Sequence, residues 1–238
     1  MTSVAHYLRT LLALATVSLA SALLLGCAQS QSAALVTASH LAARDSAAKI
    51  DAALLNPSIR YLRVTVNREP ALLALGFVDV DAMGRPIEVW LSADREVLRL
   101  QAGRLAGLIG TAIEWRRVML PAQLPAWGVS PDKSAFLRIR DEMPGYRIGL
   151  REQMMRISIA PPQGTELRQL APEALQWFEE RASLVTEDGE PAGSAAAPVA
   201  RYGVKQGAGL SEVVYAEQCV SAEICLTWQT WPPRGPNN

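Results

Sequence analysis

Short runs of alternating apolar and polar residues, separated by turn residues, repeat along this chain from about residue 59 onward. The pattern is clearest over residues 71–110, where turns at 81–84, 93–95 and 102–103 divide the apolar runs. Alternation with two to four turn residues between runs is typical of consecutive strands paired as an antiparallel meander. We therefore predict a mainly β fold, with one large antiparallel meander sheet curled into a half-barrel or a sandwich.

Two segments depart from this alternation and predict helix. Residues 33–54 are rich in alanine, the best helix former, and we expect an N-terminal helix within a tether. Residues 172–185 begin with a proline, which suits a first helical turn. One short internal helix is predicted there, because a helical face would collect Leu175, Phe178, Ala182 and Val185.

The first 26 residues predict a leader and not a part of the fold. An uncharged apolar run, residues 11–25, follows Arg9 and is too short to span a bilayer comfortably, so a signal peptide is favoured over a transmembrane helix. The run ends in Leu-Leu-Leu-Gly before Cys27, which is the pattern of a bacterial lipoprotein signal. We expect cleavage after Gly26 and acylation of Cys27; the alternative is an ordinary secretory signal with an incidental cysteine.

Acyl chains on Cys27 would attach the mature chain to membrane lipid permanently, since each buried methylene contributes about 0.8 kcal/mol. Ala28 follows the cysteine where a sorting signal for the inner membrane would place Asp, so we expect the outer membrane. The predicted organisation is a signal peptide (1–26), the lipidated cysteine with tether and helix (27–56), one β-rich domain (57–231) with a flexible loop near 187–200, and a tail (232–238).

Charge and histidine content exclude several classes of function. Lys+Arg and Asp+Glu number 23 each, so there is no basic excess that would favour nucleic acid. The two histidines, His6 and His40, lie in the predicted leader and tether, so we expect no histidine-based catalytic site, no metal site and no cofactor. The remaining enzymatic alternative is a carboxylate pair for glycoside hydrolysis, with Asp79 and Asp81 as candidates. Because Asp beside a turn is ordinary, we expect no catalytic residue and no enzymatic activity.

The other two cysteines, Cys219 and Cys225, predict a disulfide. They would lie in a compartment that permits disulfides, and their bond would close a loop of about seven residues. The alternative is a pair of buried thiols.

Aromatic and arginine residues are the candidate contacts with a glycan or a partner protein. Among the six tryptophans, Trp90 alternates with the predicted core and Trp127 lies on a proline-rich loop, so these two are the best candidates for stacking on sugar rings. Arginines recur along the strand pattern, and Arg138, Arg140 and Arg147 predict a solvated face that meets an acidic polymer or a partner. The alternative is that the tryptophans fill the core and the arginines serve solubility.

Five segments together resemble a known family. They are the lipoprotein signal ending at Cys27, Ser58-Ile59-Arg60-Tyr61-Leu62-Arg63, Leu73-Ala74-Leu75-Gly76-Phe77-Val78, Glu88-Val89-Trp90 and Leu98-Arg99-Leu100-Gln101-Ala102-Gly103-Arg104-Leu105. In this combination the chain resembles the YjbF/GfcB family, the group 4 capsule polysaccharide lipoproteins. The resemblance is best over residues 57–115 and extends more loosely to 231, whereas residues 29–53 and the tail do not follow it.

The resemblance implies an outer-membrane lipoprotein encoded among exopolysaccharide or capsule genes and working beside an outer-membrane β-barrel protein. It carries over no catalytic residue. We therefore expect a non-enzymatic factor in exopolysaccharide or capsule assembly or export, anchored through acylated Cys27 at the periplasmic face of the outer membrane. The alternatives are a periplasmic carrier module that binds glycan or lipid and a carboxylate polysaccharide hydrolase.

Overall fold

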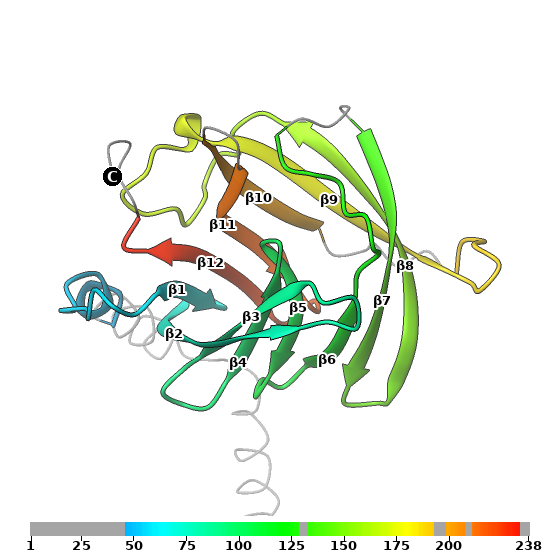
Figure 1. Ribbon diagram of the computed structural model, residues 1–238, viewed down its shortest axis with the longest axis horizontal. Coiled ribbons are helices and arrows are strands. Elements are labelled where there is room, and N and C mark those ends of the chain that lie inside the picture. The colour runs from blue at the N-terminus through cyan, green and yellow to red at the C-terminus, as the bar shows by residue number, and fades with distance from the viewer. Residues whose placement is uncertain (1–45, 129–132, 193–198, 208–210, 234–238) are drawn as a thin grey trace, which may run out of the picture. The chain divides into compact units, whose positions relative to one another are not determined.

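The computed structural model describes residues 46–128, 133–192, 199–207 and 211–233. Within these ranges one sheet contains twelve strands, each antiparallel to its neighbours in the chain (Figure 1). The strands are β1 (Tyr61–Val66), β2 (Glu69–Val80), β3 (Pro86–Leu91), β4 (Val97–Gln101), β5 (Arg104–Ile109), β6 (Glu114–Met119), β7 (Lys133–Met143), β8 (Arg147–Ile159), β9 (Gln176–Val185), β10 (Val199–Gln206), β11 (Ser211–Cys219) and β12 (Cys225–Trp231).

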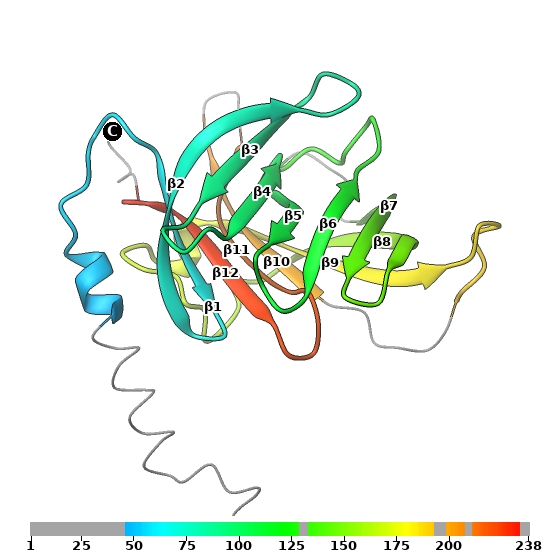
Figure 2. The same cartoon turned by 90° about the horizontal axis from the view of Figure 1, so that it is seen from below.

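The first and last strands pair with each other and close the sheet into a barrel. The register of this seam runs from Tyr61 opposite Trp231 to Val66 opposite Leu226, and Figures 1 and 2 show β12 alongside β1. The predicted mainly β fold with an antiparallel meander is confirmed. The sheet goes beyond the expected half-barrel, because pairing at the seam satisfies the edges that an open sheet would leave unpaired.

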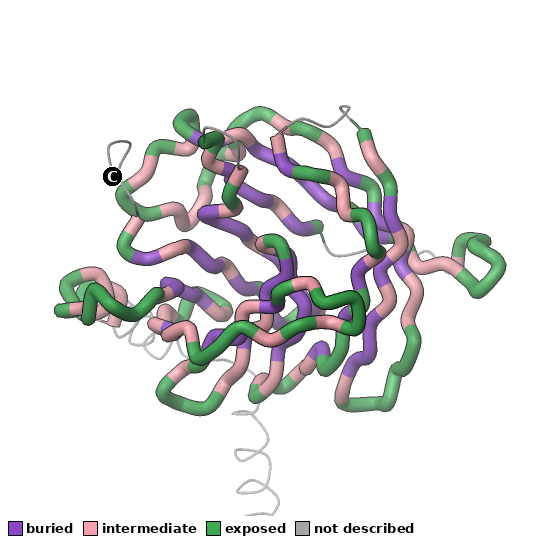
Figure 3. Tube along the Cα trace, in the orientation of Figure 1, coloured by how far each residue is buried: buried purple, intermediate pink, exposed green. Residues whose placement is uncertain are grey.

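Alternation along each strand places one set of side chains inside the barrel. This interior holds the main hydrophobic cluster, and Figure 3 shows its buried positions recurring along the strands. Members from different strands include Leu62, Val64, Trp90, Leu98, Trp115, Met154, Phe178, Tyr202 and Trp228.

A second, smaller apolar cluster covers part of the outer surface. Trp177 of β9 and Tyr215 of β11 pack with their ring centroids 5.7 Å apart, together with Leu175. Trp177 alternates with Phe178 of the interior cluster, so it faces outward, where residues from the segment between β8 and β9 pack against it. The Trp177 indole N–H donates a hydrogen bond to the Pro172 carbonyl at 2.7 Å. The outer faces of β9 and β11, which lie on either side of β10, are therefore buried at these positions.

The helix predicted over residues 172–185 is wrong. Only Pro172–Ala174 form a turn of 3-10 helix, η2, and Gln176–Val185 form strand β9. Both faces of β9 are buried over part of their length, and its inward residue Glu180 is charged, so the alternation of apolar and polar residues expected of a strand is hidden.

Of the described part of the predicted tether, residues 46–56, only residues 46–51 are helical, and Asp51 forms an ion pair with Arg63 of β1 at 2.8 Å. The predicted signal peptide, Cys27 and His40 lie outside the described residues. So do residues 193–198 of the predicted loop, and β10 already begins at Val199. No helix in the described ranges is long and apolar enough to cross a membrane.

The β11–β12 hairpin carries the predicted disulfide. Cys219 and Cys225 are register partners at its end and are bonded to each other. The bond therefore closes the loop between the last two strands of the sheet.

Candidate functional site

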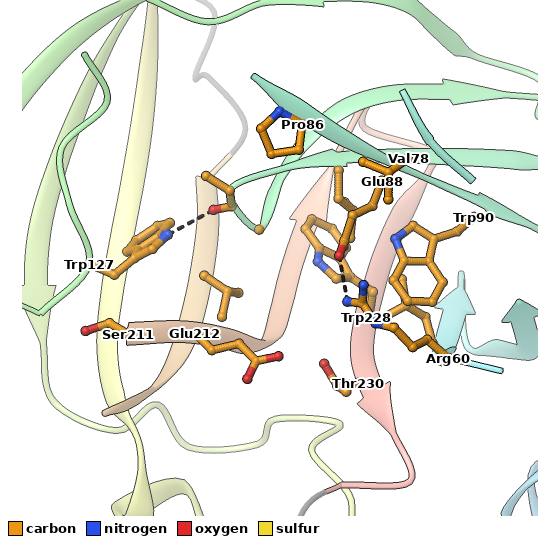
Figure 4. Close-up of a pocket in the computed structure, with 15 residues that line it drawn as sticks. Arg60, Val78, Pro86, Glu88, Trp90, Trp127, Ser211, Glu212, Trp228 and Thr230 are labelled. Atoms are coloured by element: carbon orange, nitrogen blue, oxygen red, sulfur yellow. Dashed lines mark hydrogen bonds and ion pairs between the residues drawn. The ribbon is translucent and has the colours of Figure 1, made fainter. Parts of the chain in front are cut away.

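A pocket of about 500 Å³ opens at one end of the barrel (Figure 4). This end contains the start of β1, the end of β12, the β4–β5 turn and the start of β11, all of which contribute lining residues. The volume falls within the range of about 300 to 1,000 Å³ that is usual for small-molecule sites. The pocket is therefore large enough for one or a few sugar rings or a molecule of similar size.

Two tryptophans form one wall of this pocket. Trp90 of β3 and Trp228 of β12 are 1% and 2% exposed, and strand alternation points both into the barrel. The indole N–H group of each is buried without a hydrogen-bond partner among the described residues. Aromatic rings pack on apolar surfaces and sugar rings, so the parts of these rings that reach the pocket can contact a ligand.

Trp127 forms the opposite side and comes from the segment between β6 and β7 (Figure 4). Its indole N–H donates a hydrogen bond to the Ala102 carbonyl at 2.9 Å. Its ring packs against Phe178 and Tyr202, with centroids 5.5 and 4.9 Å away, and the guanidinium carbon of Arg104 lies 3.9 Å from its centroid. Trp127 is thus fixed on several sides and links the pocket to the barrel interior.

Polar side chains border the aromatic walls. Arg60, just before β1, forms an ion pair with Glu88 of β3 at 2.6 Å, and its guanidinium carbon lies 5.4 Å from the Trp90 centroid. Ser211 and Thr230 also line the pocket, from β11 and β12 (Figure 4). Aromatic walls beside charged and hydroxyl groups suit a ligand that offers both apolar faces and hydroxyl groups.

The predicted arginine face divides into two parts. Arg138 and Arg140 of β7 are 4% and 5% exposed, so the prediction that they lie on a solvated face is wrong. They face into the barrel and share Glu152 of β8, with Nε to oxygen distances of 2.7 and 3.0 Å. Arg147 is half exposed and pairs with Glu142 at 2.8 Å. None of the three lines the tryptophan pocket.

A second buried ion pair lies behind Trp127. Arg104 and Glu180 are 2.7 Å apart and almost fully buried. Arg156 lies beside them and donates to the Ala126 carbonyl at 2.7 Å. Burial, then the neighbouring charge of Arg104, lower the pKa of Arg156. Burial and the charge of Glu180 raise the pKa of Tyr202, so its hydroxyl stays protonated. The interior beside β7 to β10 is therefore filled by ion pairs and aromatic rings.

Of the predicted contact residues, the structure brings Trp90 and Trp127 together around one pocket. Sequence reasoning missed Trp228, Arg60 and Glu88. Trp228 lies two residues after Leu226 in a closing strand, so the two side chains share a face. This spacing could have placed Trp228 in the interior. Arg60 and Glu88 pair across β2, which lies between β1 and β3, and the sequence holds no local signal for this pairing.

The alternative catalytic carboxylates are held in ion pairs. Asp79 pairs with Arg99 at 2.7 Å and Asp81 with Arg85 at 2.6 Å, and neither lines the tryptophan pocket. Among the described residues, no three His, Cys, Asp or Glu side chains gather in an arrangement that could hold a metal ion.

Fold and site together define a closed twelve-stranded antiparallel barrel with a tryptophan-lined pocket at one end. A solved structure of similar fold is that of the hypothetical lipoprotein YmcC from Escherichia coli (K12), with a TM-score of 0.54 at 16% sequence identity. The match covers 87% of this chain and 100% of that one. This likeness shows that the two chains share a fold. No family model matches the chain, and no curated protein matches it.

Proposed function

We propose that this chain is an outer-membrane lipoprotein, anchored through Cys27 at the periplasmic face, that takes part without catalysis in the export or assembly of an extracellular polysaccharide. In this role it holds a segment of the glycan in the tryptophan pocket and works beside an outer-membrane β-barrel protein. The lipoprotein signal, the resemblance to the YjbF/GfcB family and the fold shared with the hypothetical lipoprotein YmcC support the anchor and its setting.

The pocket between Trp90, Trp127 and Trp228 is the observation that carries the binding part of the proposal. A sugar ring presents apolar C–H faces and a border of hydroxyl groups. Indole faces match the former, while the Arg60–Glu88 pair and the hydroxyl of Thr230 match the latter. The pocket also supports a second candidate, a periplasmic carrier that binds glycan or lipid without an export partner.

Glycan binding can be tested with oligosaccharides prepared from the polysaccharide of the producing strain. We expect calorimetry to show saturable binding that weakens about tenfold or more in Trp90→Leu, as for a central binding residue. Trp177→Leu is the matched control, because Trp177 is equally buried but lies in the outer cluster. No binding, or equal weakening in both variants, would contradict the proposal.

The export role can be tested in a deletion strain. We expect secreted polysaccharide to fall while polymer synthesis continues, and expect the wild-type gene, but neither Cys27→Ser nor Trp90→Leu, to restore secretion. Normal secretion in the deletion strain would exclude the role. Purification of the lipidated protein from outer membrane should recover a β-barrel partner; recovery of glycan or lipid alone would favour the carrier.

A further inference from the structure

A second pocket, of about 330 Å³, opens at the other end of the barrel. β1 shows the relation between the two: its early residue Leu62 lines the tryptophan pocket, whereas Val64 and Val66 line the second one. The second pocket lies near the β1–β2 and β3–β4 turns: Glu69 is the first residue of β2, and Asp94 belongs to the β3–β4 turn.

A single layer of paired residues lies between the two pockets. Trp228 is the register partner of Val64, and Trp90 is the register partner of Leu98. In each pair the tryptophan lines the first pocket and the aliphatic residue lines the second. The two pockets are therefore separate sites that lie back to back, and they are lined by different residues.

The base of the second pocket is aliphatic. Its inward-facing side chains are Val64, Leu73, Leu98, Leu108 and Leu226, all 4% exposed or less. Unlike the first pocket, it has no aromatic lining residue. Such a base is apolar and carries no directional group, so it suits a flexible hydrocarbon chain and not a sugar ring.

The border of this pocket is acidic. Glu69, Asp94 and Glu96 line it, and no Lys or Arg does. None of the three carboxylates forms an ion pair within the part of the chain that the structure describes, and Glu69 and Asp94 are exposed. Exposed Arg68 and Arg95 belong to the same two turns but do not line the pocket, so the lining itself is acidic and favours a cation over an anion.

We propose that this second pocket binds an aliphatic chain that ends in a cationic group, such as an alkylamine. The chain packs on the aliphatic base, and the ammonium group lies among Glu69, Asp94 and Glu96 at the opening. This site does not depend on glycan binding at the other end, because the two pockets have no described group in common that would contact both ligands.

Calorimetric titration with n-alkylamines, below the concentrations at which they form micelles, tests the aliphatic part. Each added methylene should strengthen binding about fourfold until the pocket is full, the factor that corresponds to about 0.8 kcal/mol per buried methylene. Absence of binding, or affinity that does not depend on chain length, would overturn the proposal.

Comparison of decylamine with decanoate tests the acidic border, since the two ligands carry opposite charges on similar chains. We expect the amine to bind at least about tenfold more tightly at low salt. The double variant Glu69→Gln/Asp94→Asn should remove most of this preference while the chain-length dependence remains. Glu187→Gln, an exposed acid remote from this pocket, is the matched control. Equal binding of both ligands, or an unchanged preference in the double variant, would contradict the assignment.

Two further measurements identify the site and separate this result from the glycan test. Ala71→Leu adds bulk to a partly buried lining residue and should abolish amine binding without changing oligosaccharide binding. Trp90→Leu should weaken oligosaccharide binding, while decylamine should still bind more tightly than decanoate. Amine binding that survives Ala71→Leu would place the amine elsewhere and overturn the proposal.

Discussion

At the scale of single residues, Glu152 is a buried carboxylate that pairs with two buried arginines. Its side chain is 1% exposed, and its two oxygens bind Arg138 and Arg140. A buried ion pair adds little net stability, because desolvation offsets the attraction between its members; removing one member, however, leaves a buried charge without a partner. Arg140 keeps a second partner in Glu142, whereas Arg138 has Glu152 as its ion-pair partner.

We predict that Glu152→Gln lowers the free energy of unfolding by about 3 to 5 kcal/mol, since Arg138 stays buried without a carboxylate. Urea unfolding followed by circular dichroism measures the change. Arg116→Gln is the control: Arg116 is 59% exposed and pairs with Glu114 at the surface, so its loss should cost about 1 kcal/mol or less. Equal effects would show that the interior pair behaves as a surface pair.

Asp81 fixes the segment that leads to Trp127. Burial alone would raise its pKa, but the backbone N–H of Arg85, the side chains of Gln101 and Arg85 and the backbone N–H of Met83 outweigh this and hold the pKa well below its usual range. Arg85, oriented by Asp81, donates to the Leu120 carbonyl at 2.9 Å and to the Ala122 carbonyl at 3.2 Å.

This shift predicts a loss of stability in acid. The pKa of Asp81 is lower in the folded state, so its contribution is complete above the ordinary pKa of 3.8 and falls as the pH drops below about 4. The difference in unfolding free energy between wild type and Asp81→Asn should therefore be constant from pH 7 to 5 and shrink below pH 4. A difference that does not change down to pH 3 would contradict the prediction.

Residue types alone could not show that Arg138 and Arg140 face the barrel interior. Trp90 and Trp127, singled out because one follows strand alternation and the other lies on a loop, both line the tryptophan pocket, and their contact with a ligand stays a prediction. Arg138 and Arg140 occupy inward positions that pattern analysis treats as solvent-facing, since charge is normally a surface signal. Their partner Glu152 lies on the next strand, and this pairing cannot be read from sequence without the register.

At the scale of elements, the β4–β5 turn connects the fold to the tryptophan pocket. Ala102 and Gly103 both have positive φ, 49° and 77°. A Cβ on Gly103 would lie 2.5 Å from the Cβ of Val213, another residue of the pocket wall. Glycine is therefore required here for both the backbone conformation and the close approach of β11.

Gly103→Ala should destabilise the protein more than Gly84→Ala does. Gly84 has a φ of 74° and nothing within 4 Å of its added Cβ, so its substitution measures backbone strain alone, about 1 kcal/mol. Gly103→Ala adds overpacking of about 1 to 3 kcal/mol. Thermal and urea unfolding of both variants measure the difference, and equal costs would indicate that Val213 moves aside freely.

The β11–β12 disulfide should contribute about 2 kcal/mol, the value for a loop of about seven residues in the chain-entropy model. The double variant Cys219→Ser/Cys225→Ser should lower the urea midpoint by the corresponding amount, and reductant should lower the wild-type midpoint to the same value. Unchanged unfolding of the wild type in reductant would contradict this contribution.

Most elements could be predicted from sequence, and the exception has a physical cause. In residues 71–110 short apolar or alternating runs are divided by turn residues, and these turns fall where β2, β3 and β4 end. β9 is covered on both faces over part of its length, and inward Glu180 is neutralised by Arg104 from β5. Its periodicity therefore does not resemble that of a half-buried strand. Closure at the seam also left no local signal, since β1 and β12 are far apart in sequence.

At the scale of the whole molecule, the interior of the barrel has two unlike halves. Beside β7 to β10 it is filled by ion pairs and aromatic rings. Beside β1 to β5 and β12 it contains the two pockets, back to back. The filled half gives the barrel a fixed frame, and the hollow half is where ligands of different chemistry can be accommodated.

A chain that ends at residue 224, without β12, should fail to remain monomeric. Both β1 and β11 would then present unpaired edges that can pair with other chains. Light scattering after size exclusion should show oligomers or aggregates, whereas a chain that ends at residue 233 should elute as the full-length protein does. A monomeric shortened chain with native circular dichroism would show that the seam is dispensable.

The seam also sets the order in which the barrel can be completed during synthesis. Every other pairing joins strands that are neighbours in the chain, so β2 to β11 can pair as they emerge. β1 can pair with β2 early, but its pairing with β12 must wait until residues 225–231 arrive. Closing so long a loop delays folding because its entropy is lost before its contacts form. We expect the newly made chain to pass through a long-lived open sheet, which would make it a client of chaperones.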